Sequence, residues 1–166
     1  MIKFSVKAGE GTKLYNDEFD NIRDGVVFGK NCIVHSHVWI GENVKIGDNV
    51  KIQAFTFIPE GVTIEDDVFI GPRVTFTNDP NLTIQGKDFW RSTRVKKGAK
   101  IGAGAMIKAG VVIGENAIIG LGAVVLKDVP AGEMWVGNPA KKLRKSWIKK
   151  LWRQFIEFIT PGEVIK

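Results

Sequence analysis

Residues 38–70 read VWIGENVKIGDNVKIQAFTFIPEGVTIEDDVFI, and this stretch has a large apolar residue at every sixth position, beginning at Ile40. The spacing continues in both directions, with one interruption, and every member is Ile, Val or Phe. A period of six excludes an amphipathic α-helix, whose apolar stripe repeats at 3.6 residues. It predicts short strands joined by corners. The sixteen positions are Ile22, Phe28, Val34, Ile40, Ile46, Ile52, Ile58, Ile64, Ile70, Phe76, Val95, Ile101, Ile107, Ile113, Ile119 and Val125.

A second apolar column accompanies the first and is small or β-branched almost throughout. Val38 and Ile40 flank Trp39, so period-2 alternation in a strand sends both of them inward and Trp39 outward. Glycine often follows the large residue, which predicts tight corners that need permissive backbone angles. Those glycines are Gly29, Gly41, Gly47, Gly71, Gly102, Gly114 and Gly120. The pattern as a whole predicts an all-β solenoid, a parallel β-helix.

These repeats resemble the hexapeptide-repeat, or isoleucine-patch, acyltransferases over about residues 20–142. The resemblance implies a left-handed β-helix of triangular section, with three hexads in each coil. Sixteen hexads then give about five coils. We expect residues 1–21 to form an N-terminal cap segment and residues 22–140 to form the β-helix.

The interruption is an inserted loop at about residues 78–93. Nineteen residues separate Phe76 from Val95 where six would continue the repeat, so thirteen are extra. The insertion begins with Asn-Asp-Pro, a strong turn signal, and loops on a rigid scaffold often carry function. Phe89 and Trp90 lie on it, and either a neighbouring subunit covers them or the loop buries its own aromatics.

The phrases IEDDVFIGP (64–72), FTND (76–79) and VGNPAK (136–141) are similar to one subgroup of this family. Its members N-acetylate amino groups of nucleotide-linked sugars. The resemblance implies acetyl-CoA as co-substrate and a small-molecule acceptor. It also implies a homotrimer with active sites between subunits, and a role in surface glycan synthesis. The subgroup usually follows FTND with an aromatic residue and Pro-Arg, whereas this chain has PNLTIQGKDF, so the sugar stays open.

The same resemblance places Asn78 at the acceptor amine with Asp79 beside it, although both also suit a strand-ending turn. A hydroxyl acceptor would need a base to remove its proton during attack, and an unprotonated amine would not. The insertion contains no histidine. The chain has His35 and His37, both predicted to point outward, and either could be the base in the alternative of O-acetylation. The absence of a loop histidine favours N-acylation.

The donor is expected along the coils after Val95. Residues 91–140 carry seven basic and three acidic side chains, a net +4 that suits polyanionic coenzyme A. By resemblance, small corner residues and nearby lysines hold it. The alternative is that these residues have no role in binding, the glycines being ordinary corner residues and the lysines a solvated run of charge. The residues concerned are Gly102, Ala103, Lys108, Ala109, Lys127, Asn138, Pro139, Ala140, Lys141 and Lys142.

Charge and composition exclude several other functions. The net charge is +6, and residues 141–166 alone have eight Lys or Arg against two Glu, so residues 1–140 sum to zero. A neutral body offers no basic face for nucleic acid. Two histidines two residues apart do not supply the three protein ligands of a catalytic zinc site, and we expect no metal. A single cysteine excludes a disulfide framework. A non-catalytic scaffold remains an alternative.

The C-terminal residues 141–166 have a different period. Leu143, Trp147 and Leu151 recur at i+4, which predicts a basic amphipathic helix from about Lys142 to Ile159, ended by Pro161-Gly162. The helix either packs on the trimer or makes peripheral contact with an anionic membrane. The chain shows neither a secretory h-region nor an apolar run of about 20 residues, so we expect it in the cytoplasm.

Overall fold

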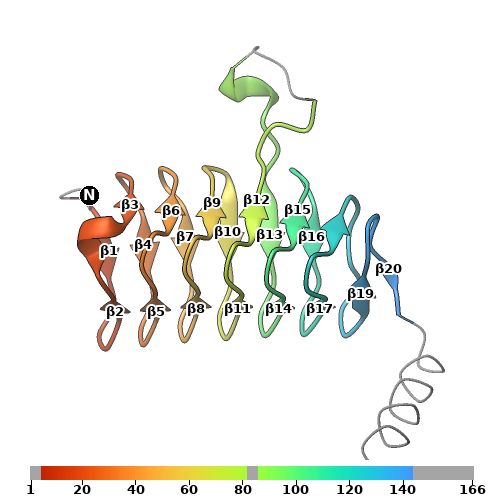
Figure 1. The fold of residues 1–166 in the computed structure, drawn as a ribbon. Coiled ribbons are helices and arrows are strands. Elements are labelled where there is room, and N and C mark those ends of the chain that lie inside the picture. Colours follow the sequence, from red (N-terminus) through yellow and green to blue (C-terminus); the bar gives the residue numbers. More distant parts are fainter. Residues whose placement is uncertain (1–4, 82–85, 144–166) are drawn as a thin grey trace, which may run out of the picture.

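The computed structural model describes residues 5–81 and 86–143, and it is a parallel β-solenoid of about 7 turns (Figure 1). Successive strands pass in turn to three sheets, which we call faces A, B and C, so each coil as far as β18 contributes one strand to each face. After β18, face B continues only as an isolated bridge between Ile113 and Val129, and β19 and β20 both belong to face C. The strand pairs are parallel except for the last, β19 with β20, which is antiparallel. The predicted parallel β-helix with three strands per coil is therefore confirmed, and its direction of winding stays a prediction.

The strands are short, and the three faces are as follows. Face A contains β3 (Asn21–Ile22), β6 (Trp39–Ile40), β9 (Phe57–Ile58), β12 (Thr75–Phe76), β15 (Met106–Ile107) and β18 (Val124–Val125). Face B contains β1 (Lys7–Ala8), β4 (Val27–Phe28), β7 (Lys45–Ile46), β10 (Val62–Ile64), β13 (Thr93–Val95) and β16 (Val112–Ile113). Face C contains β2 (Lys13–Leu14), β5 (Ile33–Val34), β8 (Lys51–Ile52), β11 (Phe69–Ile70), β14 (Lys100–Ile101), β17 (Ile118–Ile119), β19 (Met134–Val136) and β20 (Lys141–Lys142).

Corners between the faces form three long edges. The A–B edge consists of the corners that follow face A strands, such as the one with Glu42. The B–C edge consists of those that follow face B strands, such as the one with Asn49. The C–A edge consists of those that follow face C strands, such as the one with Phe55. These names are used below.

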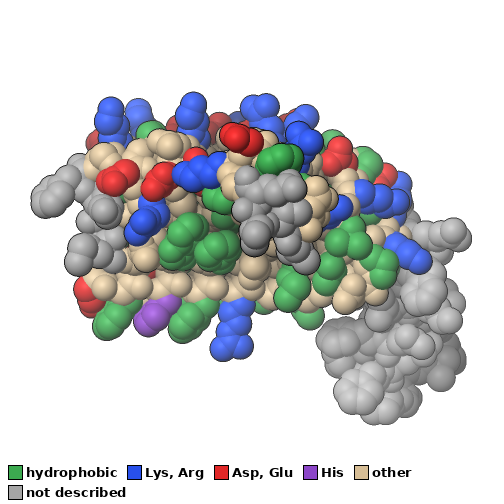
Figure 2. Space-filling model, turned by 90° about the horizontal axis from the view of Figure 1, so that it is seen from above, with side chains coloured by type: hydrophobic (Ala, Val, Ile, Leu, Met, Phe, Trp, Pro, Cys, Tyr) green, Lys and Arg blue, Asp and Glu red, His purple; other side chains and the backbone are tan. Residues whose placement is uncertain are grey.

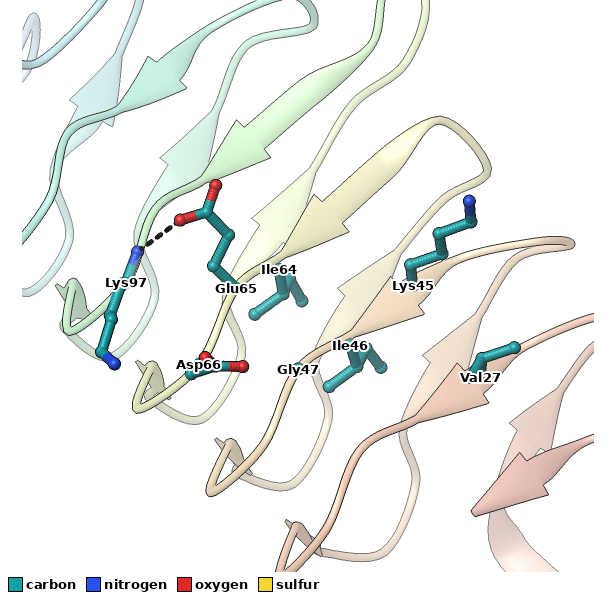
Figure 3. A pocket seen from close by; sticks show the side chains of 8 residues that line it. All are labelled: Val27, Lys45, Ile46, Gly47, Ile64, Glu65, Asp66 and Lys97. Atoms are coloured by element: carbon teal, nitrogen blue, oxygen red, sulfur yellow. Dashed lines mark hydrogen bonds between the residues drawn. The ribbon is translucent and has the colours of Figure 1, made fainter. Parts of the chain in front are cut away.

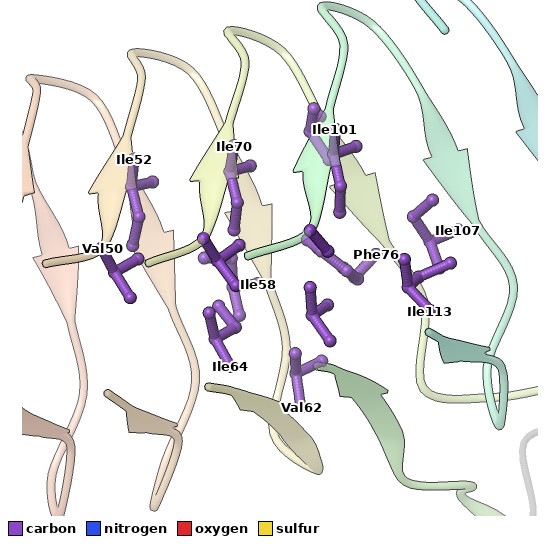
Figure 4. Close-up of a cluster of buried hydrophobic side chains, with 14 of the residues drawn as sticks. Val50, Ile52, Ile58, Val62, Ile64, Ile70, Phe76, Ile101, Ile107 and Ile113 are labelled. Carbon is purple, nitrogen blue, oxygen red and sulfur yellow. The ribbon is translucent and has the colours of Figure 1, made fainter. Parts of the chain in front are cut away.

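The core is the predicted six-residue column. All sixteen large residues are buried, with at most 3% of any of them exposed. Figure 4 shows several of them, such as Ile58, Ile70 and Ile113, pointing from the three faces into one interior. Residues of the second column, such as Val44 and Ala105, are buried with them. Burying an aliphatic side chain of this size contributes roughly 1.5–3 kcal/mol. The core is therefore a continuous rod along the solenoid axis rather than a central cluster.

The prediction of five coils is wrong, because strands at both ends pair outside the strict repeat. Phe28 pairs with Ile46, eighteen residues on, but Ala8 pairs with Phe28 across twenty residues. At the other end Trp135 pairs with Ile119 across sixteen. These end turns contain two residues more or two fewer than the regular eighteen, so their strands fall out of the six-residue spacing and a count of hexads misses them. Strands β1 and β2 lie within residues 1–21, the segment expected as a cap, which also contains the 3-10 turn η1 (Asp17–Phe19).

The expectation of permissive backbone angles is wrong for the glycines that follow the large residue. None of the seven has a positive φ. These positions need glycine because the backbone of the next coil lies too close for a Cβ atom. A Cβ built on Gly41 would lie 2.3 Å from the Glu60 nitrogen, and one built on Gly102 would lie 2.6 Å from the Leu121 nitrogen. These glycines let one backbone pass over another.

The insertion and the tail leave this regular body. Ile64 pairs with Val95 across thirty-one residues, thirteen more than one coil, so the predicted insertion lies between β12 and β13 (Figure 1). It contains the 3-10 turn η2 (Lys87–Phe89). Lys142, where the C-terminal helix was expected to begin, belongs to strand β20, and residues 144–159 of that helix lie outside the described residues. Within the described ranges no helix is long and apolar enough to cross a bilayer.

Replacing Gly41 with Ala is expected to lower the free energy of unfolding by about 1–3 kcal/mol, because the new Cβ must displace the Glu60 backbone. Gln53→Ala is the matched control, since Gln53 occupies the equivalent corner position of another coil with a side chain already accommodated. Urea unfolding of both variants measures the difference. Equal urea midpoints for the two variants would contradict the prediction, because they would show that neighbouring coils can move apart to accept the Cβ without loss of stability.

Candidate functional site

Corner residues one coil apart form a column along the A–B edge, and its chemistry changes at the insertion. Asp24, Glu42, Glu60 and Asn78 follow one another at intervals of eighteen residues. Beyond the insertion the next corner begins with Lys108, and the Ala109 N–H donates to Thr77 Oγ1 at 2.9 Å. The edge is thus acidic on the N-terminal side of Asn78 and basic beyond it.

Asn78 and Asp79 form the base of the insertion, as predicted. The Arg91 N–H donates to the Asn78 carbonyl oxygen at 2.8 Å, which closes the loop. Asp79 Oδ1 accepts a hydrogen bond from the Asn81 N–H at 2.8 Å, the geometry of a turn. Both residues are half-buried. Both residues therefore stabilise the turn at the base of the insertion, and Asn78 also lines a small hollow.

That hollow, of about 190 Å³, lies between the insertion and the N-terminal coils. Trp39 forms one wall from face A, where it stacks on Phe57 with ring centroids 4.6 Å apart. Trp90 lines the hollow from the insertion and is half-buried, while Phe89 is 46% exposed. The insertion therefore covers one of its two aromatics on its own chain and leaves the other largely exposed.

Lys87 ties the insertion to the A–B edge. Its Nζ lies 2.6 Å from Glu60 Oε2 and 3.4 Å from Glu42 Oε2, and 5.7 Å from the Trp90 ring centroid. The hydrogen bond to Glu60 is the main cause that raises the pKa of Lys87 above its usual value. Sequence reasoning missed this contact. The spacing of eighteen between Glu42 and Glu60 was the available signal, since it places both carboxylates at one corner position.

The predicted donor residues fall on two edges. Lys108, Ala109 and Lys127 lie on the A–B edge and line a hollow of about 440 Å³ in the coils after the insertion. Gly102 and Ala103 lie on the C–A edge, across face A. Ala103 is exposed, so a ligand can reach it. The structure thus places both groups in the same coils but does not bring them together.

The motif from Asn138 to Lys142 closes the C-terminal end of the solenoid. The Ala140 N–H donates to the Val124 carbonyl of β18 at 2.8 Å, and the peptide bond before Pro139 is cis. Lys142 forms an ion pair with Glu133, which lowers the pKa of that carboxyl. Lys141 and Lys142 are exposed. This end is therefore basic and beside face A.

Both histidines lie on the C–A edge, away from Asn78. His35 stacks on Tyr15 with centroids 5.6 Å apart, and its buried Nε2 has no hydrogen-bond partner among the described residues. His37 is exposed and lies between the rings of Phe19 and Phe55. Of the hollows lined by described residues alone, the one that contains Asn78 includes neither imidazole.

A further groove, of about 430 Å³, lies on face B and contains none of the predicted site residues (Figure 3). Its carboxylate Glu65 accepts a hydrogen bond from the Lys97 N–H at 3.0 Å and pairs with Arg94 at 2.8 Å. These contacts hold the coils together across the level of the insertion. Among residues 5–81 and 86–143, no group of three or more His, Cys, Asp or Glu side chains is placed to hold a metal ion.

Comparison with known protein families gives two matches to hexapeptide repeats. The family described as bacterial transferase hexapeptide (six repeats) matches residues 43–78 and 92–127, and the hexapeptide repeat of succinyl-transferase matches residues 22–54. The chain belongs to the hexapeptide-repeat transferases. The first match stops at Asn78 and resumes at Ser92, so the family's repeat leaves out the insertion.

Several hexapeptide acyltransferases are similar to this chain. The serine acetyltransferase of Buchnera aphidicola is 38% identical over 123 residues, which is 73% of this chain but 41% of that protein. The crystal structure of perosamine N-acetyltransferase from Caulobacter crescentus, a mutant in complex with CoA and GDP-perosamine, superposes with a TM-score of 0.66 at 25% identity, over 76% of this chain and 54% of that one. AntD, an N-acyltransferase of Bacillus cereus solved as a mutant with dTDP and coenzyme A, has a TM-score of 0.71 at 21% identity over 91% of each chain, which shows a shared fold. The chain spans about half the length of the first two.

Replacing Lys87 with Met is expected to release the insertion from the A–B edge, because the ion pairs to Glu60 and Glu42 are lost. Exposed ion pairs add little global stability, so the melting temperature should stay unchanged while proteolytic cleavage between Asn78 and Arg91 becomes faster. Asp88→Asn, a charge removed from the same turn, is the control. Restored protection in the double variant Lys87→Glu with Glu60→Lys would confirm the pair, and cleavage of K87M at the wild-type rate would contradict it.

Proposed function

We propose that this protein transfers an acetyl group from acetyl-CoA to an amino group of a nucleotide-linked amino sugar. Membership of the hexapeptide-repeat transferases supports acyl transfer, and likeness to an N-acetyltransferase solved with CoA and GDP-perosamine supports this acceptor class. The observation that carries the proposal is the A–B edge. There Thr77, which directly precedes the half-buried Asn78 and Asp79, accepts a hydrogen bond from the Ala109 N–H, and Ala109 and Lys108 line the hollow in the basic coils.

The chemistry needs a held donor and an aligned amine. The unprotonated amine attacks the thioester carbonyl carbon, the C–S bond breaks, and the products are the amide and the thiol of coenzyme A. Asn78 offers an amide that can bind the acceptor amine. Asp79 offers a carboxylate that can take the proton which the nitrogen loses, before that proton passes to the departing thiolate. Lys108, Lys127, Lys141 and Lys142 supply positive charge for the phosphates of the donor.

A homotrimer with sites between subunits is part of this proposal. Within one chain Asn78 lies on the A–B edge and Ala103 lies on the C–A edge, so face A separates the two groups. A neighbouring copy that places its A–B edge beside the C–A edge of the first would join them. A cytoplasmic location would give access to acetyl-CoA. Peripheral membrane contact rests on the C-terminal residues that the structure does not describe.

Asp79→Asn is expected to lower kcat/KM for transfer to the amine by roughly 100-fold, because the proton acceptor is lost while the turn is kept. Thiol release from acetyl-CoA is measured with a panel of dTDP-, UDP- and GDP-linked amino sugars, the matching hydroxyl sugars and free serine. Asp88→Asn, which removes an exposed acid from the same insertion, is the matched control and should retain wild-type activity.

The panel also decides between the alternatives. Release with serine or hydroxyl sugars, lost in His37→Asn and not in Asp79→Asn, would establish O-acetylation and overturn the choice of amine. A folded protein that binds no coenzyme A and releases no thiol with any acceptor would leave a scaffold role.

Ala103→Trp is expected to abolish coenzyme A binding, because a large side chain on the C–A edge would fill the surface on which we place the donor. Ala131→Trp is the control, since Ala131 is equally exposed but lies on the B–C edge. Calorimetric titration with coenzyme A measures both, and unchanged melting temperatures exclude misfolding. Equal affinity of the two variants would remove the C–A edge from the donor site.

A further inference from the structure

The C–A edge holds bulky side chains where the other two edges do not. Most corners of the solenoid have one position with a positive φ, and on the A–B and B–C edges the described residues there are Asn, Asp or Gly. On the C–A edge they include His37 (φ 62°), Phe55 (φ 63°) and Arg73 (φ 59°). Bulky residues rarely adopt this conformation because Cβ crowds the following carbonyl. Strained backbone of this kind is a reason to look for a function.

These three side chains and Phe19 form one stack, which we call the edge ladder. The Phe19 and His37 ring centroids are 5.0 Å apart, and those of His37 and Phe55 are 4.8 Å apart. The Arg73 guanidinium carbon lies 5.9 Å from the Phe55 ring centroid. In Figure 2 a histidine lies along one long edge between two hydrophobic side chains, with a basic side chain further along, which is the order of types in the ladder. Its residues come from four successive coils.

The solenoid does not need these side chains for its own packing. Phe19 and Phe55 are 58% and 55% exposed. The Arg73 N–H donates to the Ala54 carbonyl of the preceding coil at 3.0 Å, a bond that a smaller residue at this position would form equally well. The Arg73 guanidinium is exposed and forms no ion pair with a carboxylate of the described residues. A strained, exposed aromatic row ending in a free cation is typical of a binding surface.

The ladder stops where the proposed donor surface begins. After Arg73 the next positive-φ residues on the C–A edge are Gly104 and Gly122, and a Cβ on either would meet nothing within 4 Å. The Gly104 N–H donates to the Pro72 carbonyl at 2.8 Å, so Arg73 lies one coil away from Gly104 and from the side-chain-free surface that begins there. A ligand with an anionic group at Arg73 would therefore extend from the ladder toward the part of the C–A edge where we place the donor.

We propose that the edge ladder binds the nucleoside diphosphate part of the acceptor, an inference that rests on the proposed function and names the part of the substrate that the fold recognises. The base packs against the outward edges of the Phe19, His37 and Phe55 rings, because the faces of these rings within the stack cover one another. The Arg73 guanidinium binds the diphosphate. The amino sugar, attached to the diphosphate, then extends past Arg73 toward Ala103.

The test is calorimetric titration of the full-length protein with dTDP, UDP and GDP, each alone and in the presence of saturating coenzyme A. Arg73→Gln is expected to weaken binding about 10- to 100-fold through loss of a charge-assisted phosphate contact. Phe55→Asn should weaken it about 2- to 10-fold through loss of an edge-to-face aromatic contact. Because Asn suits the positive φ, the melting temperature of F55N should stay unchanged or rise by up to about 4 °C. Arg94→Gln and Phe69→Thr, exposed residues of faces B and C, are the matched controls.

Three results would overturn the inference. Wild-type protein that binds none of the three nucleotides, or variants that bind them as tightly as wild type, would show that the ladder is not the site. Displacement of the nucleotide by coenzyme A would assign the ladder to the donor's own adenosine diphosphate. A lower oligomer mass of F55N in analytical ultracentrifugation would make the ladder a subunit contact. Acetyl transfer by the wild-type protein is measured separately, so a failure of the proposed function is distinguished from a failure of this inference.

Discussion

The stacking of one coil on the next determines where every outward side chain lies. Parallel hydrogen bonds such as Gly41 N–H to the Ile58 carbonyl, at 2.8 Å, hold neighbouring coils around a continuous rod of buried Ile, Val and Phe. Glycines such as Gly41 let the backbones approach this closely. Residues eighteen apart in sequence therefore become neighbours, and chemistry that recurs at this interval becomes a column on the surface.

Two of these columns change character at the same level. On the A–B edge, acidic Glu42 and Glu60 give way after Asn78 to a basic corner around Lys108. On the C–A edge, the edge ladder gives way after Arg73 to Gly104 and Gly122. The insertion leaves the solenoid at this level as well. The chain is thus one fold with two chemically different halves. In the function that we propose, the N-terminal coils would bind the acceptor and the C-terminal coils would bind the donor.

The repeat in the sequence was sufficient for the core and insufficient for the ends. Every hexad residue is buried, and the thirteen-residue insertion has the predicted place, because inward and outward alternation is a local property of a strand. The coil count failed where Ala8 and Trp135 pair at intervals of twenty and sixteen residues. The glycines were placed correctly and explained wrongly, because the obstacle at Gly41 is the backbone of Glu60, which is distant in sequence.

By itself the sequence determined a parallel β-helix with an Ile-rich interior, one insertion at Asn78-Asp79, and a basic C-terminal half. The tertiary structure alone decided which outward side chains contact one another across coils. Once three strands per coil are known, the eighteen-residue interval and the thirteen-residue insertion place His37 and Ala103 on one edge, away from Asn78. The Lys87 contact with Glu60 and the stack from Phe19 to Arg73 are likewise products of register. The physical reason is that strand alternation is encoded locally, whereas neighbours between coils depend on how many residues each complete turn contains.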